Sequence, residues 1–382
     1  MSKERAFLAI YISIAISYLG VGLVAPLISI VLAEHGANSV IVGLVGTTMF
    51  TAFTLASFPL GHWIDRRGAK LFLIWGLVVY GVSLAFFAFT NSIALFFILR
   101  FIEGVGAAAI SVATETMIGQ LSEPHERARR MSYYALSVGA GWAAGPLAGA
   151  LLFTLQPGLP FFACCLLSVL AAIAVAIFVP HSGTRGHHQD ASIKQFSFVL
   201  IIPVSAGALY GYLMSSLVTL FPLYLKRLGI SETLMGSIIT AVIIGTILSQ
   251  VPIGHAADKF GKIRVLFISS VIVAVVFLLM PQSSNWQSFL IYGAVLGAAA
   301  GSFYPVGLSI IGELVRHEKL GAANALFSLM FGIGSLIGPT VSGYTMNQFG
   351  YGWLFYLPAS LTILFCFMVI FSKLKMADSR VP

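Results

Sequence analysis

Three ionisable residues inside one long apolar run are the residues of this chain best suited to chemistry. Arg100, Glu103 and Glu115 lie within residues 93–119, where the other side chains are apolar, small or uncharged. An ionisable side chain at the centre of a membrane helix costs about 2.5–3.5 kcal/mol on insertion scales, so its retention points to a function. A carboxyl group in an apolar setting can exchange a proton, and a nearby arginine favours its charged form. These residues therefore suggest proton exchange.

Helical geometry brings the three residues onto one side of their run. At 100° per residue, Glu103 lies about 300° and Glu115 about 60° round the helix from Arg100. We expect this face to turn toward a central cavity, where Arg100 pairs with Glu103 or Glu115 and protonation of a glutamate releases the pair. The alternative is a permanent Arg100–Glu103 pair at i, i+3 that only anchors the structure. Glu115 has no charged neighbour at helical spacing and is the stronger candidate for the proton site.

The composition determines what kind of element carries these residues. Hydrophobic residues make up 58% of the 382-residue chain and charged residues only 9%. A soluble domain usually carries roughly 25% charged residues, so this chain cannot cover a surface that faces water. A net charge of +8 is compatible with a nucleic-acid partner, but the basic residues sit in short turns where membrane topology accounts for them. We predict an all-α membrane protein with no nucleic-acid partner.

Apolar runs long enough to cross a bilayer, about 20 residues each, occur twelve times. The predicted spans are 6–33, 41–64, 71–89, 93–119, 131–155, 159–180, 196–225, 233–257, 264–282, 288–314, 321–349 and 353–372. Of the 21 Lys and Arg residues, 18 lie in turns on the side of the N-terminus and two in turns on the other side. Positive residues mark the cytoplasmic side, so we predict that both termini are cytoplasmic, in a bacterial inner membrane.

A duplicated charged turn divides the chain into two related halves. The turn of residues 61–70 recurs at residues 254–263, after 193 positions. We predict two six-helix bundles, 1–180 and 196–382, joined by a cytoplasmic linker over 181–195. Parallel repeats of this kind place a substrate site between the halves, near the membrane midplane.

We predict that the duplicated turns act as gates. The expected gating residues are Gly61, Asp65, Arg66, Gly68, Lys70, Gly254, Asp258, Lys259, Gly261 and Lys262. The first glycine of each turn would let its span approach the opposite half. Asp65 would cap the eleventh span near Gly321, and Asp258 would cap the fifth span near Met131, each worth about 0.3–2 kcal/mol. The alternative is that the turns only satisfy membrane topology.

A second duplicated motif lies in the fifth and eleventh spans, again 193 positions apart. Its residues are Gly141, Gly145, Pro146, Gly149, Gly334, Gly338, Pro339 and Gly343. Proline removes a backbone donor and weakens a helix, and glycine permits bending as well as close packing. We interpret the motif as a hinge. Ordinary small-residue packing of helices is the alternative.

The chain resembles the major facilitator superfamily along its whole length, and within it the twelve-span drug:proton antiporter group. The resemblance rests on the turn 61–70, the phrase Arg100-x-x-Glu103-Gly104-x-Gly106-Ala107-Ala108, the run 141–149 and the phrase Gly20-Val-Gly22-Leu-Val-Ala-Pro26-Leu. The chain departs from the usual patterns at Trp63, Ala69, Glu103 and Ala150, and its acidic residue near the end of span four is displaced to Glu115. These departures concern the coupling details and not the superfamily.

The resemblance implies a secondary active transporter that works by alternating access, with proton-coupled export of small amphipathic compounds as the favoured function. An importer, by proton symport or uniport, shares every superfamily motif and stays open as the alternative. It would not need Gly145-Pro146. A third hypothesis, a receptor that transports nothing, fits less well because the sequence shows no appended sensory domain.

The expected cavity is mostly uncharged. Spans one and seven commonly line the cavity in this family, and here they offer Tyr18, Tyr210 and Tyr212. Because Arg100 is the only buried base, such a cavity suits a neutral or anionic molecule better than a cation. No catalytic constellation or metal cluster stands outside the spans, so we expect no enzyme activity, cofactor or metal. The expected partners of this monomer are a small-molecule substrate, protons and the lipid bilayer.

Overall fold

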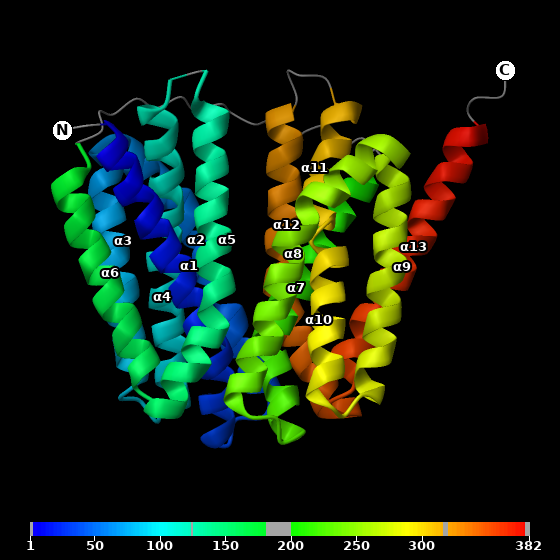
Figure 1. Cartoon of the computed structure of the whole chain (residues 1–382), viewed down its shortest axis with the longest axis horizontal. Coiled ribbons are helices and arrows are strands. Elements are labelled where there is room, and N and C mark those ends of the chain that lie inside the picture. Colours follow the sequence, from blue (N-terminus) through cyan, green and yellow to red (C-terminus); the bar gives the residue numbers. More distant parts are fainter. Residues whose placement is uncertain (1–2, 124, 181–199, 316–319, 379–382) are drawn as a thin grey trace. The chain divides into compact units, whose positions relative to one another are not determined.

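A computed structural model of the chain describes residues 3–123, 125–180, 200–315 and 320–378, and every element in these ranges is a helix (Figure 1). The first half contains α1 (Lys3–Glu34), α2 (Ser39–Arg67), α3 (Ala69–Phe87), α4 (Ile93–Leu121), α5 (Arg127–Leu155) and α6 (Leu159–Phe178). The second half contains α7 (Ile201–Arg227), α8 (Glu232–Phe260), α9 (Lys262–Leu279), the 3₁₀ turn η2 (Met280–Gln282), α10 (Trp286–Ala300), α11 (Phe303–Leu314), α12 (Leu320–Phe349) and α13 (Trp353–Asp378). Twelve stretches of these helices are long and apolar enough to cross a membrane, which confirms the twelve predicted spans.

The tenth span is not the single helix that the hydrophobic run 288–314 predicts. It is divided into α10 and α11 by a turn at Gly301 and Ser302. Pro305 explains the break, because its ring would clash with the carbonyl of Gly301 and it offers no N–H to that carbonyl. The hydroxyl of Thr246 in α8 also donates to the carbonyl of Gly297 at 3.0 Å, next to the broken turn.

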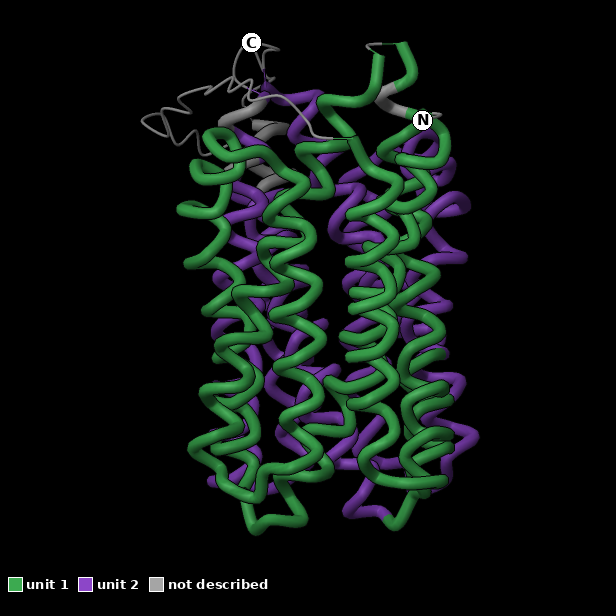
Figure 2. The backbone as a smooth tube through the Cα atoms, turned by 90° about the vertical axis from the view of Figure 1, so that its left-hand side faces the viewer, with its two compact units in different colours: residues 1–188, 229–240 green, residues 189–228, 241–382 purple. Residues whose placement is uncertain are grey.

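The described helices form two compact units (Figure 2). Unit 1 comprises residues 1–188 and 229–240, and unit 2 comprises residues 189–228 and 241–382. In unit 1, α1 packs against α5 and α6, and α4 packs against both α2 and α3. In unit 2, α7 packs against α12, α11 and α13, and α9 packs against α10 and α13. The first turns of α8 thus belong to unit 1, and the predicted linker 181–195 lies outside the described residues.

The 193-residue offset seen at two motifs extends through the backbone. The helices α2 and α8 each have 29 residues and begin 193 positions apart. Two pairs of glycines with positive φ keep the same offset, Gly36 with Gly229 and Gly68 with Gly261. Such backbone angles favour glycine because it lacks a Cβ atom. The two units are therefore pseudo-symmetric six-helix bundles.

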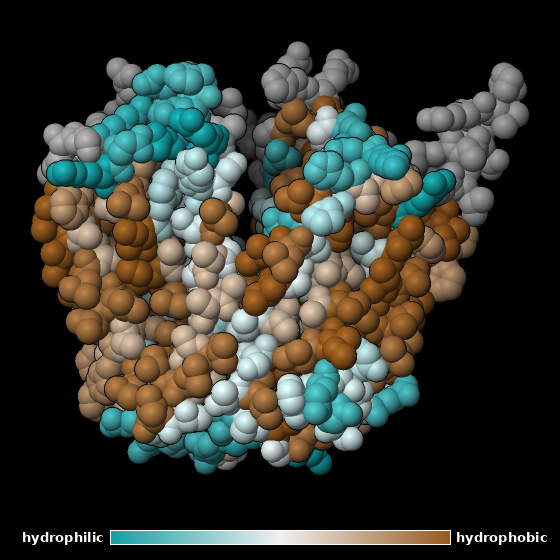
Figure 3. All heavy atoms as spheres, in the orientation of Figure 1, coloured by the Kyte–Doolittle hydropathy of each residue, from teal (hydrophilic) through white to brown (hydrophobic). Residues whose placement is uncertain are grey.

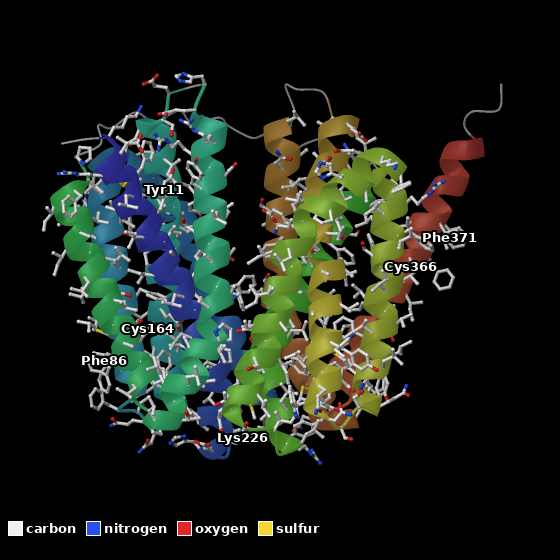
Figure 4. The ribbon with its side chains drawn as sticks, in the orientation of Figure 1. Tyr11, Phe86, Cys164, Lys226, Cys366 and Phe371 are labelled. Atoms are coloured by element: carbon white, nitrogen blue, oxygen red, sulfur yellow. The ribbon has the colours of Figure 1, made fainter. Side chains whose placement is uncertain are left out.

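Apolar side chains cover the outside of the helices. Figure 3 shows hydrophobic residues on the sides of each unit and hydrophilic residues gathered at the helix ends. Phe86 of α3 and Phe371 of α13 project outward and are 56% and 68% exposed (Figure 4). Exposed aromatic side chains in such numbers would be costly in water but are favourable against lipid. Together with the twelve spans, they identify an integral multi-pass membrane protein.

Candidate functional site

Arg100 and Glu103 form an ion pair in the interior of unit 1. The Nη1 atom of Arg100 lies 3.1 and 3.0 Å from the two carboxylate oxygens of Glu103, one turn along α4. Arg100 is 3% exposed and Glu103 is fully buried. Tyr80 of α3 and Cys164 of α6 lie close enough to interact electrostatically with the Glu103 carboxylate. The geometry agrees with the anchoring alternative for this pair.

This enclosure corrects two expectations about span four. Arg100 and Glu103 do not share an open face with Glu115, because the pair is buried where α2 and α3 pack against α4, whereas the Glu115 side chain is exposed. The three residues lie within a predicted 120° arc of α4, and the neighbouring helices decide which part of that arc is covered. Arg100 is also neutralised by Glu103, so it no longer gives a reason to prefer an anionic substrate.

Glu115 forms a small polar cluster with two hydroxyl side chains that the sequence analysis did not single out. Tyr134 of α5 donates a hydrogen bond to Oε1 of Glu115 at 3.0 Å. Ser111, one turn earlier on α4, donates to the same oxygen at 3.4 Å, and its Oγ lies 3.5 Å from the Tyr134 hydroxyl. We call Ser111, Glu115 and Tyr134 the α4–α5 cluster. It joins an ionisable group to donors suited to its charged form.

The spacing of the two helices contains a signal for this cluster. Glu115 lies six residues before the end of α4, and Tyr134 lies seven residues after the start of α5. In two antiparallel helices joined by a short turn, residues at equal distances from the turn lie at about the same level along the helix axes, since each residue rises 1.5 Å. This rule would have predicted from the sequence that Tyr134 lies beside Glu115.

The three predicted cavity tyrosines differ in their surroundings. Tyr18 is half-buried on α1. Tyr210 is buried and its ring centroid lies 5.8 Å from that of Phe331 of α12. Tyr212 is buried between α7 and α12, where its hydroxyl lies 2.7 Å from the Oγ of Ser342. Tyr210 and Tyr212 are thus packed inside unit 2, and their role in a cavity stays a prediction.

The glycines of the predicted hinge motif allow close packing of helices within each unit. A Cβ atom at Gly141 would overlap the carbonyl oxygen of Ala15 in α1, and one at Gly145 would lie 2.6 Å from the Cα of Gly22. In unit 2, a Cβ atom at Gly334 would overlap the carbonyl oxygen of Ala208 in α7. These contacts support the packing alternative. Both α5 and α12 continue through their prolines, Pro146 and Pro339, and a hinge role for the motif stays a prediction.

The duplicated turns have the same backbone geometry in both units. Gly68 has φ 90° and ψ 140°, and Gly261 has φ 94° and ψ 131°. The lysines of these turns hold neighbouring helix ends: Lys70 donates to the carbonyl of Ala176 at 2.8 Å, and Lys262 pairs with Glu313 at 2.6 Å. Cations are favourable near helix C-termini, so both lysines have a structural role within their units.

The remaining gating residues lie partly or fully at the surface of their units. Asp65 is half-buried, whereas Asp258, Arg66 and Lys259 are exposed. A Cβ atom at Gly61 or at Gly254 would meet no atom within 4 Å, so packing inside their own units does not require these glycines. The caps that we predict for Asp65 and Asp258 would join the two units, and they stay predictions.

A group of ion pairs ties the start of α1 to the turn between α4 and α5. Glu126 accepts from Lys3 at 2.7 Å and from Arg130 at 3.2 Å, and Arg130 also pairs with Glu4. The hydroxyl of Tyr11, labelled in Figure 4, donates to the backbone carbonyl of Arg130 at 3.2 Å. The hydrogen bond from Lys3 is the main reason that the pKa of Glu126 is lowered to about 2.

Comparison with known proteins decides the family. The family model described as Major Facilitator Superfamily matches residues 10–227 and 204–381. The chain belongs to the major facilitator superfamily. It is 30% identical to the uncharacterised MFS-type transporter YfkF of Bacillus subtilis (strain 168), over 93% of this chain and 92% of that protein. The MFS-type transporter YcaD of Salmonella enteritidis is 27% identical over 92% of each chain. The chain is therefore a transporter and not an enzyme.

Solved structures show the major facilitator fold over the whole chain. A bacterial homologue of the human lysosomal transporter Spinster, in an inward-facing and occupied conformation, matches with a TM-score of 0.82 and 13% identity over 98% of both chains. The nucleoside transporter NupG matches with a TM-score of 0.77 and 14% identity, over 99% of this chain and all of that one. At these identities the likeness concerns the fold alone.

Among the described residues, no group of His, Cys, Asp and Glu could hold a metal ion.

Proposed function

We propose that this major facilitator is a proton-coupled exporter of small amphipathic compounds, with Glu115 as its proton site. The observation that carries the proposal is an exposed carboxyl group in a membrane span, hydrogen-bonded by Tyr134 and Ser111. An exposed carboxyl group can exchange its proton with solvent or substrate, whereas Glu103 is sealed beside Arg100. Arg100 and Glu103 therefore anchor α4 and leave proton exchange to Glu115.

Export direction is supported by the motif of the fifth span. The resemblance to drug:proton antiporters includes Gly141, Gly145, Pro146 and Gly149, and the glycines bring α5 into close contact with α1. Close, continuous packing of this kind would resist leakage of protons and substrate along the seam. The transporter would act as a monomer in the cytoplasmic membrane, with both termini cytoplasmic.

The proposal is tested by reconstituting the protein in liposomes that contain a pH-reporting dye. A panel of neutral, cationic and anionic fluorescent amphiphiles is added, and the movements of compound and protons are recorded together. Proton movement opposite to the compound supports antiport. Movement in the same direction would make the protein a symporter, and compound movement without protons would make it a uniporter; either would overturn the proposal.

A further inference from the structure

The hydroxyl groups around Glu115 are arranged to favour its ionised form. Tyr134 and Ser111 both donate to the same carboxylate oxygen, Oε1, at 3.0 and 3.4 Å. A hydrogen bond to a charged group is roughly twice as strong as one between neutral groups. Loss of a proton from Glu115 therefore strengthens both bonds, and gain of a proton weakens them.

Few other groups act on this carboxyl group. Among the described residues, only Tyr134 and Ser111 contribute hydrogen-bonding or charge interactions to Glu115. Tyr18 of α1 lies near enough to act on Tyr134 electrostatically. Arg100 and Glu103 lie 15 and 12 residues away along the same helix, or about 22 and 18 Å, and they neutralise each other. The two hydroxyl groups are thus the main polar influence on the Glu115 proton.

The second unit shows that the fold does not need the tyrosine. The positions that match Ser111, Glu115 and Tyr134 after 193 residues are Tyr304, Leu308 and Phe327. Phe327 is fully buried, and its ring centroid lies 5.0 Å from that of Tyr304. The matching position of unit 2, 327, already holds a phenylalanine, so the same helix arrangement can accommodate a phenylalanine at position 134. The Tyr134 hydroxyl therefore has a role other than packing.

We propose that Tyr134, assisted by Ser111, is a positioning residue that holds the Glu115 carboxylate and sets the pH at which the α4–α5 cluster takes up its proton. This inference rests on the proposed function, in which Glu115 carries the coupled proton. Tyr134 acts through Glu115 and takes no proton itself. Without the Tyr134 hydroxyl, Glu115 takes up its proton at a higher pH.

The test measures protonation of Glu115 without any substrate. A hydrophobic carbodiimide reacts with protonated carboxyl groups in apolar surroundings, and mass spectrometry of the α4 peptide separates the products of Glu115 and Glu103. The pH at which labelling of Glu115 is half-maximal is compared in wild-type protein and Tyr134→Phe. A hydrogen bond to a charged group is worth about 1.5–3 kcal/mol, so the midpoint should rise by about one to two pH units. Ser111→Ala should raise it less, because its bond is longer.

A neighbouring tyrosine provides the matched control. Tyr133 is exposed on α5 and its ring lies 6.0 Å from that of Tyr11, so Tyr133→Phe makes the same chemical change away from Glu115. Its midpoint should equal that of the wild type. An unchanged midpoint in Tyr134→Phe, or an equal rise in both variants, would overturn the inference.

Failure of the inference can be told apart from failure of the proposed function. If Glu115→Gln abolishes proton coupling in liposomes but Tyr134→Phe leaves the labelling midpoint unchanged, only the role of Tyr134 is wrong. If Tyr134→Phe raises the midpoint but Glu115→Gln keeps its proton coupling, Tyr134 positions Glu115 as inferred, and the proposed function is wrong because Glu115 is not the carrier.

Discussion

The two units use one backbone plan for different chemistry. In unit 1, Glu115 accepts hydrogen bonds from Tyr134 and Ser111 at the junction of α4 and α5. At the matching junction of unit 2, Leu308 and Tyr304 pack against a core cluster that includes the fully buried Phe327. Duplication preserved the helices and their turns, while the side chains diverged. One half keeps a carboxyl group that we propose as the proton site, and the other half has an apolar core there.

A second pair of matching sites diverges in the opposite sense. The side chains of Tyr212 and Ser216 of α7 and Ser342 of α12 form a buried cluster of three hydroxyl groups. The Oγ atom of Ser342 lies 2.7 Å from the Tyr212 hydroxyl and 3.1 Å from the Oγ of Ser216. The matching positions in unit 1 are Leu19, Leu23 and Gly149, and a Cβ atom at Gly149 would overlap the backbone of Leu23. At these positions unit 2 joins its two helices by hydrogen bonds, whereas unit 1 joins the matching helices by close backbone contact, which unit 2 makes elsewhere, at Gly334.

The largest expected effect comes from making span four of unit 1 resemble that of unit 2. Glu103→Leu introduces the residue found at position 296 and leaves Arg100 buried without its partner. Removing one member of a buried ion pair costs about 3–5 kcal/mol, so the variant should unfold at a much lower temperature in detergent. The double variant Arg100→Met/Glu103→Leu should recover most of that loss. A single variant as stable as the wild type would show that the pair does not anchor α4.

A smaller effect is expected where the two units are alike. Gly141→Ala and Gly334→Ala place a Cβ atom against the carbonyl oxygens of Ala15 and Ala208. Overpacking of this kind costs about 1–3 kcal/mol, and we expect similar losses of thermal stability in the two variants.

The control for these variants uses the gating glycines. Gly61→Ala and Gly254→Ala meet no atom within 4 Å and should leave the unfolding temperature within about 2 °C of the wild type. If they lower transport while stability is unchanged, their role concerns contacts outside their own units. Equal destabilisation by all four variants would contradict the packing account.

The smallest effect concerns the ion pairs at the start of α5. The pKa of Glu126 is lowered to about 2 from an ordinary value of 4.5, mainly by the hydrogen bond from Lys3. Stability from an acid with a lowered pKa is present above its unfolded value and is lost as the pH falls toward the folded one. The protection of backbone amides at the start of α5, measured relative to their intrinsic exchange rates, should therefore fall between pH 4.5 and pH 2. Glu126→Gln should remove that pH dependence, and Glu313→Gln should not.

The sequence predicted those features that depend on local signals. Hydropathy located the twelve spans, and the repeated turns at Gly61 and Gly254 revealed the 193-residue offset that the positive-φ glycines extend. The prediction of one helix over 288–314 was wrong, because the hydrophobic run does not reveal the break before Pro305. Both kinds of signal act within a few residues, which is why they can be recognised without the fold.

The surroundings of span four could not be predicted in the same way. Arg100, Glu103 and Glu115 lie within a 120° arc of one helix, and nothing in α4 itself says where that arc is covered. The enclosure of Glu103 depends on Tyr80 and Cys164, which come from other helices. The partnership between Glu115 and Tyr134 likewise depends on how α4 meets α5.

The central claim is that the proton carrier is Glu115 of unit 1, and proton movement in liposomes tests it most directly. The variants Glu115→Gln and Glu313→Gln make the same chemical change, one in the α4–α5 cluster and one at an exposed glutamate of unit 2. We predict that amphiphile-driven proton movement is lost in Glu115→Gln and kept in Glu313→Gln, while exchange of labelled for unlabelled amphiphile continues in both. Proton movement in Glu115→Gln with the rate and pH dependence of the wild type would contradict the claim.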